Sequence, residues 1–178
     1  MAGVHKATAL FAAAAITLTI GGCDRYGPHG DGDRHGKADV GAIKDAISAD
    51  EKKWSDEFQA KPMNVDALVA HYAPDAYFIV PGVKSTSGLG DIRKAYEEGV
   101  KDPNFTISFS PDKIDVAASG DLAYSRGRFT EKYTDPTTKQ VKSDEGSFIT
   151  VYKKQDDGSW KAVEDFAAAD PAPAPAAK

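Results

Sequence analysis

Three ionisable side chains stand where acid–base chemistry could occur: His71, Asp75 and Asp165. An imidazole exchanges protons near neutral pH, but at the edge of a predicted helix we favour a structural role for His71 over a catalytic one. Asp75 follows a proline, so we expect it to make turn hydrogen bonds to nearby backbone. Asp165 lies among apolar residues, and a buried carboxylate needs a partner. We expect Arg126 or Arg128 to be that partner, with catalysis by Asp165 as the alternative.

Tyr124, Arg126 and Arg128 share one phase of a predicted strand. If that phase faces the interior, the guanidinium groups would select an anionic or carbonyl-bearing ligand. If it faces outward, they are surface charges. Phe129 occupies the opposite phase and is the more obvious core residue, but periodicity alone does not decide which phase is inside.

Large apolar residues are candidates for the wall of a ligand pocket, and each would serve equally well in an ordinary core. The candidates are Trp54, Phe78, Val80, Phe148 and Trp160. With Tyr124, Arg126 and Arg128 they complete the predicted ligand-binding set. The sequence identifies no catalytic residue.

Cys23 is the only cysteine of the 178 residues and lies in the stretch TLTIGGCD. It has no cysteine partner for an intramolecular disulfide or a zinc site. The uncharged run 7–20 follows Lys6 and is shorter than the ~20 residues that span a bilayer, so it is typical of a signal peptide. The segment 20–23 resembles the lipobox of bacterial lipoproteins, which implies cleavage before Cys23 and a lipid on its thiol. The alternative is an ordinary secretory signal with an incidental cysteine.

These features predict a lipoprotein signal peptide over 1–22, a lipidated cysteine with a flexible tether over 23–37, and a disordered Pro/Ala tail over 171–178. Histidine and aspartate alternate in the tether at His29, Asp31, Asp33 and His35. Both side chains bind metals, but the composition is that of a solvated spacer. We therefore predict no metal site and no cofactor.

The chain is acidic, with a net charge of −5. Nucleic-acid binding depends on basic patches, and no basic run is present, so we predict no nucleic-acid partner. GxGxxG, P-loop and HExxH motifs are also missing from the sequence. Residues 38–170 have the length of one ordinary domain.

Apolar spacing and cap residues predict three helices in the first half of this domain. The first runs from about 39 to 60, with Ile47, Trp54 and Phe58 on one face. Asn64 caps a second helix over 65–73, which Pro74 stops. A short strand over 76–80 precedes a third helix over 88–100, for which Ser87 is the predicted cap.

After Pro103 the apolar residues alternate, and strands are predicted over 122–134, 142–154 and 160–168, with turns between them. Helices followed by antiparallel strands indicate the α+β class. The last two strands are apolar in both phases, so both faces of the sheet should be covered. We expect helices on one face and a second subunit on the other, giving a two-fold homodimer.

Three segments carry a resemblance to a known family: HYAPDAYFIVPG, GLGDIRKAYEEG and GSFITVYKKQDDGSWKAVEDF, in that order. They resemble the SnoaL-like branch of the NTF2-like superfamily, and most closely its DUF4440-type group, over about 39–170. The resemblance implies an NTF2-like cone, in which N-terminal helices pack on a strongly curved antiparallel sheet around a pocket. Enzymes and non-catalytic modules share this fold, so it does not imply one reaction.

Ketosteroid isomerase belongs to the same superfamily and uses an Asp base beside an oxyanion hole of Tyr and protonated Asp. The resemblance places the base at Val80, which cannot accept a proton. It places the tyrosine at or near Trp54, and the second aspartate near Ser147 or Phe148. The isomerase set is therefore not expected in this chain.

The sequence predicts a lipid-anchored domain on the periplasmic or extracytoplasmic side of a bacterial membrane. We expect it to bind a small, largely apolar molecule, with cyclase-, dehydratase- or hydrolase-like chemistry if it is an enzyme. The alternative is a non-catalytic dimerisation or protein-interaction module of the cell envelope. A cavity of about 300 Å³ or more would favour the first hypothesis.

Overall fold

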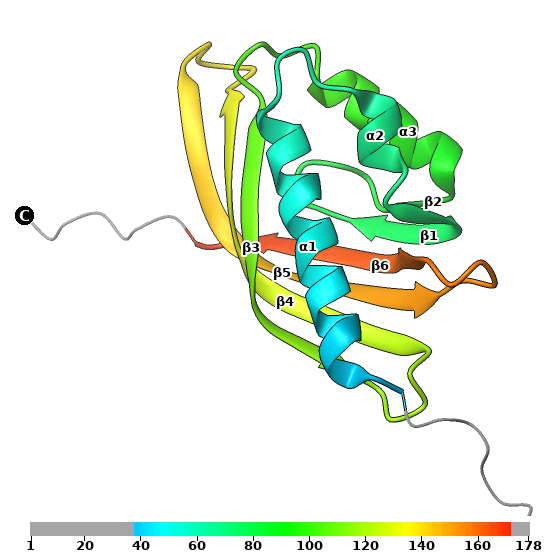
Figure 1. Ribbon diagram of the computed structural model, residues 1–178. Coiled ribbons are helices and arrows are strands. Elements are labelled where there is room, and N and C mark those ends of the chain that lie inside the picture. Colours follow the sequence, from blue (N-terminus) through cyan, green and yellow to red (C-terminus); the bar gives the residue numbers. More distant parts are fainter. Residues whose placement is uncertain (1–37, 172–178) are drawn as a thin grey trace, which may run out of the picture. The chain divides into compact units, whose positions relative to one another are not determined.

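The computed structural model describes residues 38–171, which are built from three helices and six strands (Figure 1). Along the chain these are α1 (Val40–Gln59), α2 (Val65–Val69), β1 (Tyr72–Ile79), β2 (Thr86–Ser87), α3 (Leu89–Gly99), β3 (Thr106–Val116), β4 (Leu122–Thr134), β5 (Val141–Lys154) and β6 (Trp160–Ala169). The predicted signal peptide, Cys23, the tether with His29 and His35, and the tail from 172 onward lie outside the described residues. None of the helices within 38–171 is long and apolar enough to span a bilayer.

The strands form one sheet in the order β2-β1-β6-β5-β4-β3. The predicted hairpins β3–β4, β4–β5 and β5–β6 are antiparallel, whereas β1 runs parallel to β6. The α+β class is confirmed, with one parallel strand pair that the sequence did not predict.

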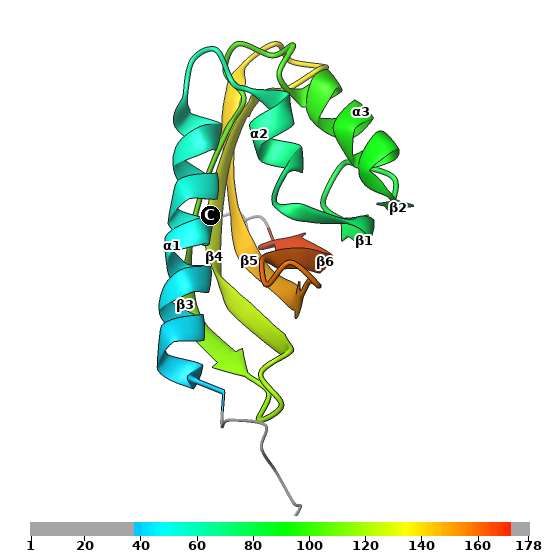
Figure 2. The ribbon, with the colours of Figure 1, turned by 45° about the vertical axis from the view of Figure 1, so that its right-hand side comes forward.

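The sheet bends, and α1 lies along the face that we call the inner face (Figure 2). Register shifts in the β3–β4 and β5–β6 pairs mark bulges, which bend strands. Gly127 and Gly146 help the bend, because a Cβ at either position would collide with the backbone of the neighbouring strand. The rings of Phe148 and Phe129 lie over these two glycines.

Helix α1 supplies much of the core. Asp39 caps it by accepting a hydrogen bond from the backbone N–H of Ala42 at 3.0 Å. Ile47, Trp54 and Phe58 are buried against the inner face of the sheet, as their spacing predicts. The opposite face of β4, β5 and β6, which we call the outer face, carries the alternate side chains.

Two predicted boundaries are wrong. The second helix ends at Val69 instead of Ala73, because Tyr72 already pairs with Ala162 of β6. Pro74 lies inside β1 where the pairing with β6 shifts register, a place that tolerates a missing N–H.

The third helix also begins differently from the prediction. Ser87 belongs to β2, and the N-cap of α3 is Gly88. Gly88 has φ of 83°, a conformation that glycine adopts readily, and no side chain caps the helix.

Candidate functional site

A cavity of about 660 Å³ opens among α1, α3, the loop after β1 and the inner face of β3 to β6. Its walls are rich in aromatic side chains: Trp54, Phe58, Phe78, Tyr96, Phe105, Phe109, Phe129, Tyr133 and Phe148. The elements that build it are those that the curvature of the sheet brings onto one side (Figure 2). An apolar cavity of this volume is ordinary for a small-molecule site.

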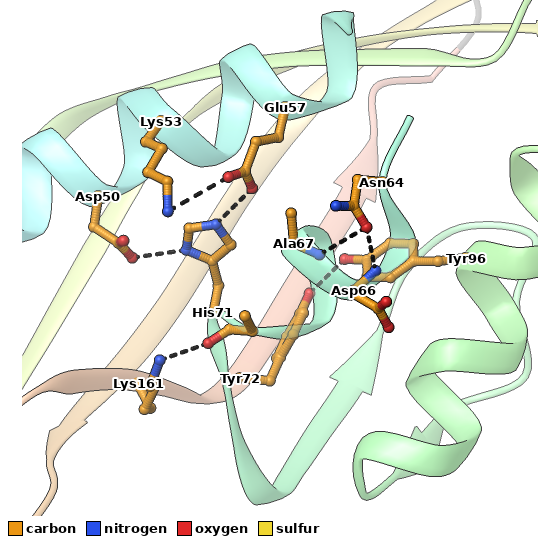
Figure 3. A network of polar contacts seen from close by, with 11 residues as sticks. Asp50, Lys53, Glu57, Asn64, Asp66, Ala67, His71, Tyr72, Tyr96 and Lys161 are labelled. Atoms are coloured by element: carbon orange, nitrogen blue, oxygen red, sulfur yellow. Dashed lines mark hydrogen bonds and ion pairs between the residues drawn. The ribbon is translucent and has the colours of Figure 1, made fainter. Parts of the chain in front are cut away.

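Polar groups converge on one part of this cavity. The hydroxyl of Tyr72 donates a hydrogen bond to Oδ2 of Asp165 at 2.5 Å, and Thr150 donates to Oδ1 at 3.3 Å. The hydroxyls of Tyr72 and Tyr96 lie 2.7 Å apart (Figure 3). Because Tyr72 gives its proton to Asp165, Tyr96 is the donor to Tyr72. Asp165, Thr150 and Tyr96 line the cavity, with Tyr72 buried behind them.

Burial shifts the pKa values of these polar side chains. It is the main reason that the pKa of Asp165 is raised, although the hydrogen bonds from Tyr72 and Thr150 lower that pKa in part. Burial, together with the charge of Asp165, raises the pKa of Tyr72 and of Tyr96 well above the usual value. The tyrosines therefore stay neutral donors, and Asp165 is the group that can take up or release a proton.

The expected pairing of Asp165 with arginine is wrong. Arg126 lies 3.7 Å from Asp112, and Arg128 lies 2.5 Å from Asp170. Both arginine side chains are more than half exposed on the outer face of β4. Strand alternation puts Asp165 on the inner face, so the arginines and Asp165 lie on opposite sides of the sheet.

Only four of the eight predicted ligand-binding residues line the cavity. Trp54, Phe78, Val80 and Phe148 line the cavity. Tyr124, like Arg126 and Arg128, lies on the outer face, and Trp160 packs against the core without lining the cavity.

Other cavity residues were not predicted. Thr150 shares the strand phase of Phe148 and Tyr152, a signal that could have placed it inside. Tyr96 comes from α3 and was not among the predicted ligand-binding residues.

His71 lies outside the cavity and contacts residues of α1, including the cavity residue Trp54. Its Nδ1 lies 2.9 Å from Asp50 and its Nε2 lies 2.9 Å from Glu57, both on α1 (Figure 3). The imidazole also stacks on Trp54, with ring centroids 4.8 Å apart and planes 13° apart. His71 is buried and does not line the cavity, so this geometry gives it a positioning role toward Trp54.

A second buried carboxyl lies between α1 and the sheet. Oε1 of Glu51 accepts hydrogen bonds from Ser125 and from Tyr152, the latter at 2.8 Å. Oε2 has no partner among the described residues. Burial raises the pKa of Glu51. Glu51 does not line the cavity, and we assign it to the core.

Comparison with known proteins gives a family and a fold. A model of the SnoaL-like domain matches residues 52–163. A search of curated proteins found no match.

Several solved structures resemble the described domain. A ketosteroid isomerase-like protein from Erwinia carotovora atroseptica SCRI1043 is 18% identical, with a TM-score of 0.58, and the match covers 74% of this chain and 97% of that chain. A conserved protein from Planctomyces limnophilus DSM 3776 is 19% identical, with a TM-score of 0.59 and coverage of 73% and 99%. An NTF2-like protein with a cystatin-like fold from Novosphingobium aromaticivorans is 16% identical, with a TM-score of 0.55 and coverage of 71% and 80%. At these identities the likeness shows the fold, and it confirms the predicted NTF2-like architecture.

Proposed function

This chain belongs to the family of SnoaL-like domains, and we propose that it binds a small, largely apolar molecule in its cavity. The observation that carries the proposal is the cavity itself. Its volume of about 660 Å³ exceeds the ~300 Å³ lower end of small-molecule sites, and it combines aromatic walls with a few convergent polar groups. A module that only binds proteins could fill this space with side chains.

Filling the cavity tests this proposal. Ala167 lines the cavity, whereas its neighbour Ala168 is exposed on the outer face. We expect the uncharged dye N-phenyl-1-naphthylamine to bind the full-length chain and Ala168→Phe alike, and Ala167→Phe to bind it at least about tenfold more weakly, because one good apolar contact changes affinity by about 1–3 kcal/mol. Fluorescence titration measures this. Equal binding by both variants would place the dye elsewhere and refute the proposal.

Proton transfer at Asp165 is a second candidate function, favoured by the tyrosine pair that orders this carboxylate at the cavity wall. A carboxylate with a raised pKa can accept a proton from a bound C–H or O–H group and return it later. This supports cyclase-, dehydratase- or hydrolase-like chemistry. The ketosteroid isomerase arrangement is not proposed, since its base position is Val80.

We also propose that the domain is anchored in the cell envelope through a lipid on Cys23, after removal of residues 1–22, and that it faces the periplasmic or extracytoplasmic side. The lipobox-like segment and the preceding apolar run support this. Two or three acyl chains anchor a protein far more firmly than one.

We also propose that the domain belongs to the DUF4440-type group. The three sequence segments quoted in the sequence analysis support this assignment.

Removing the thiol tests the anchor. We expect Cys23→Ala to shift the protein from the membrane fraction to the soluble fraction, or to leave the precursor uncut, because the lipid has no attachment atom. Fractionation and intact mass of the expressed chain measure both. A variant that stays in the membrane and is cut as before would contradict the lipoprotein hypothesis.

Homodimerisation through the outer face is proposed as well. Ile79, Phe166 and Ile149 are register partners on three adjacent strands and are all more than a third exposed. A row of apolar side chains on an open sheet face suits self-association about a two-fold axis.

A charge placed in this row should break the dimer. We expect full-length Phe166→Glu to be monomeric, because the two-fold would bring the introduced charge against an apolar partner surface. Glu164→Gln, on the same face, should remain dimeric. Light scattering after gel filtration gives the masses. If Phe166→Glu keeps the mass of the wild type, this row is not the dimer interface, and the alternative of another envelope protein as partner gains support.

A further inference from the structure

Two carboxylates oppose each other in the wall of the cavity. Glu131 of β4 and Asp144 of β5 are register partners, and both line the cavity. Directly opposite like charges destabilise a strand pair, because the side chains stand only ~5 Å apart. A fold that keeps such a pair at a cavity wall gains stability from any cation that lies between them.

The described residues leave this pair largely uncompensated. The Glu131 side chain makes no hydrogen bond and no ion pair among residues 38–171, and the Asp144 side chain accepts one hydrogen bond, from Tyr133 at 2.8 Å. The nearby Lys142 bonds to Asp135 instead. Burial and the charge of Asp144 raise the pKa of Glu131.

Negative charge predominates in the lining of the whole cavity. Its acidic and basic lining residues are one lysine, Lys84, and the carboxylates of Glu98, Asp102, Glu131, Asp144 and Asp165. Helix α3 also ends at the cavity, through Gly99, with no basic residue in its last turn. The C-terminal end of a helix carries partial negative charge, which favours cations.

The loop after α3 and the β4–β5 hairpin gather at one end of the domain (Figure 1). The carboxylate pair and the helix end thus act on the same part of the cavity, beside aromatic rings such as Phe105 and Tyr133. The faces of aromatic rings attract cations. Among the described residues no three side chains gather as a metal site, so an organic cation fits this arrangement better than a metal ion.

We propose that the ligand of this cavity is an organic cation, with a protonated amine between Glu131 and Asp144 and an apolar body among the aromatic side chains. The inference rests on the proposed function, and it adds the charge class of the ligand and the residues that recognise it. The aromatic walls alone would accept neutral and charged molecules of the same shape; the carboxylate pair discriminates between them.

Three probes of equal shape test the charge: 1-naphthylmethylamine, 1-naphthalenemethanol and 1-naphthoate, titrated calorimetrically into the full-length chain at pH 7. We expect the protonated amine to bind at least about tenfold more tightly than the alcohol, and the carboxylate most weakly. Glu131→Gln and Asp144→Asn should each remove most of the preference for the amine. Both variants relieve repulsion, so neither should impair folding.

The matched control is Glu145→Gln, which changes an exposed carboxylate next to Asp144 on the outer face. It should keep the amine preference. If the alcohol or the carboxylate binds as tightly as the amine, or if the preference survives in both cavity variants, the inference is wrong while the proposed function stands. If none of the three probes binds, the proposed function fails, and the inference fails with it.

Discussion

Replacing His71 with leucine should lower the free energy of unfolding by about 2 kcal/mol, within the ~1–3 kcal/mol that it costs to remove one partner of a hydrogen bond and leave the other partner unsatisfied. Both ring nitrogens lie 2.9 Å from carboxylate oxygens of α1. The ring thus bridges two side chains of α1, one at each nitrogen. Leucine removes the imidazole donor from both Asp50 and Glu57, so that Glu57 keeps only Lys53, at 3.5 Å, and it also removes the ring stacked on Trp54.

Urea denaturation of the wild type and the variant measures this difference. The control is Lys52→Gln, which breaks an exposed ion pair with Asp56 at 2.6 Å; exposed pairs contribute at most about 1 kcal/mol. A loss in His71→Leu no greater than in this control would show that the two carboxylates are hydrated and that the histidine does not hold α1 to the start of β1.

Asp165→Asn should slow proton exchange on a bound ligand by at least about 100-fold, the lower end of what a general acid or base contributes. Asparagine keeps an oxygen that accepts from Tyr72 and an amide that donates to Thr150, so the shape of the site and ligand binding should persist. Incorporation of deuterium from D2O into the bound molecule, followed by mass spectrometry, measures the exchange. Equal exchange in the variant would exclude Asp165 as the proton acceptor.

The difference in stability between Asp165→Asn and the wild type should depend on pH, and the pKa of Asp165 sets its direction. The pKa of Asp165 is higher in the folded protein than in the unfolded chain, so the wild type loses stability as the pH rises from the unfolded pKa through the folded pKa. Asparagine does not ionise. Relative to the wild type, Asp165→Asn should therefore gain stability from low pH toward neutral pH and then level off.

The helices and strands were largely predictable because their signals are local. The spacing of Ile47, Trp54 and Phe58 defines α1, and the alternation after Pro103 defines the strands. The end of α2 was not predictable, because His71 and Tyr72 suit a helix locally. Only the distant β6 ends the helix, since Ala162 pairs with Tyr72 of β1 and donates a hydrogen bond to the carbonyl of His71. Propensity is overridden there by tertiary pairing.

The site was predictable only in part for a related reason. Large apolar residues are more often buried than exposed, and Trp54, Phe78, Val80 and Phe148 do line the cavity. Strand periodicity separates Arg126 and Arg128 from Phe129 but does not by itself name the inner phase. The opposition of Glu131 to Asp144 depends on the register of the β4–β5 hairpin, which a one-residue slip would destroy.

Native mass spectrometry of the full-length chain, purified in mild detergent from its native host, tests the central claim that the cavity holds a small molecule. We predict a reproducible noncovalent mass, bound by the wild type and by Ala168→Phe and lost from Ala167→Phe, with a basic nitrogen in the released compound. A spectrum that shows the same bound mass in Ala167→Phe, or only the covalent mass of the chain in every sample, would contradict the account and favour a protein-interaction module.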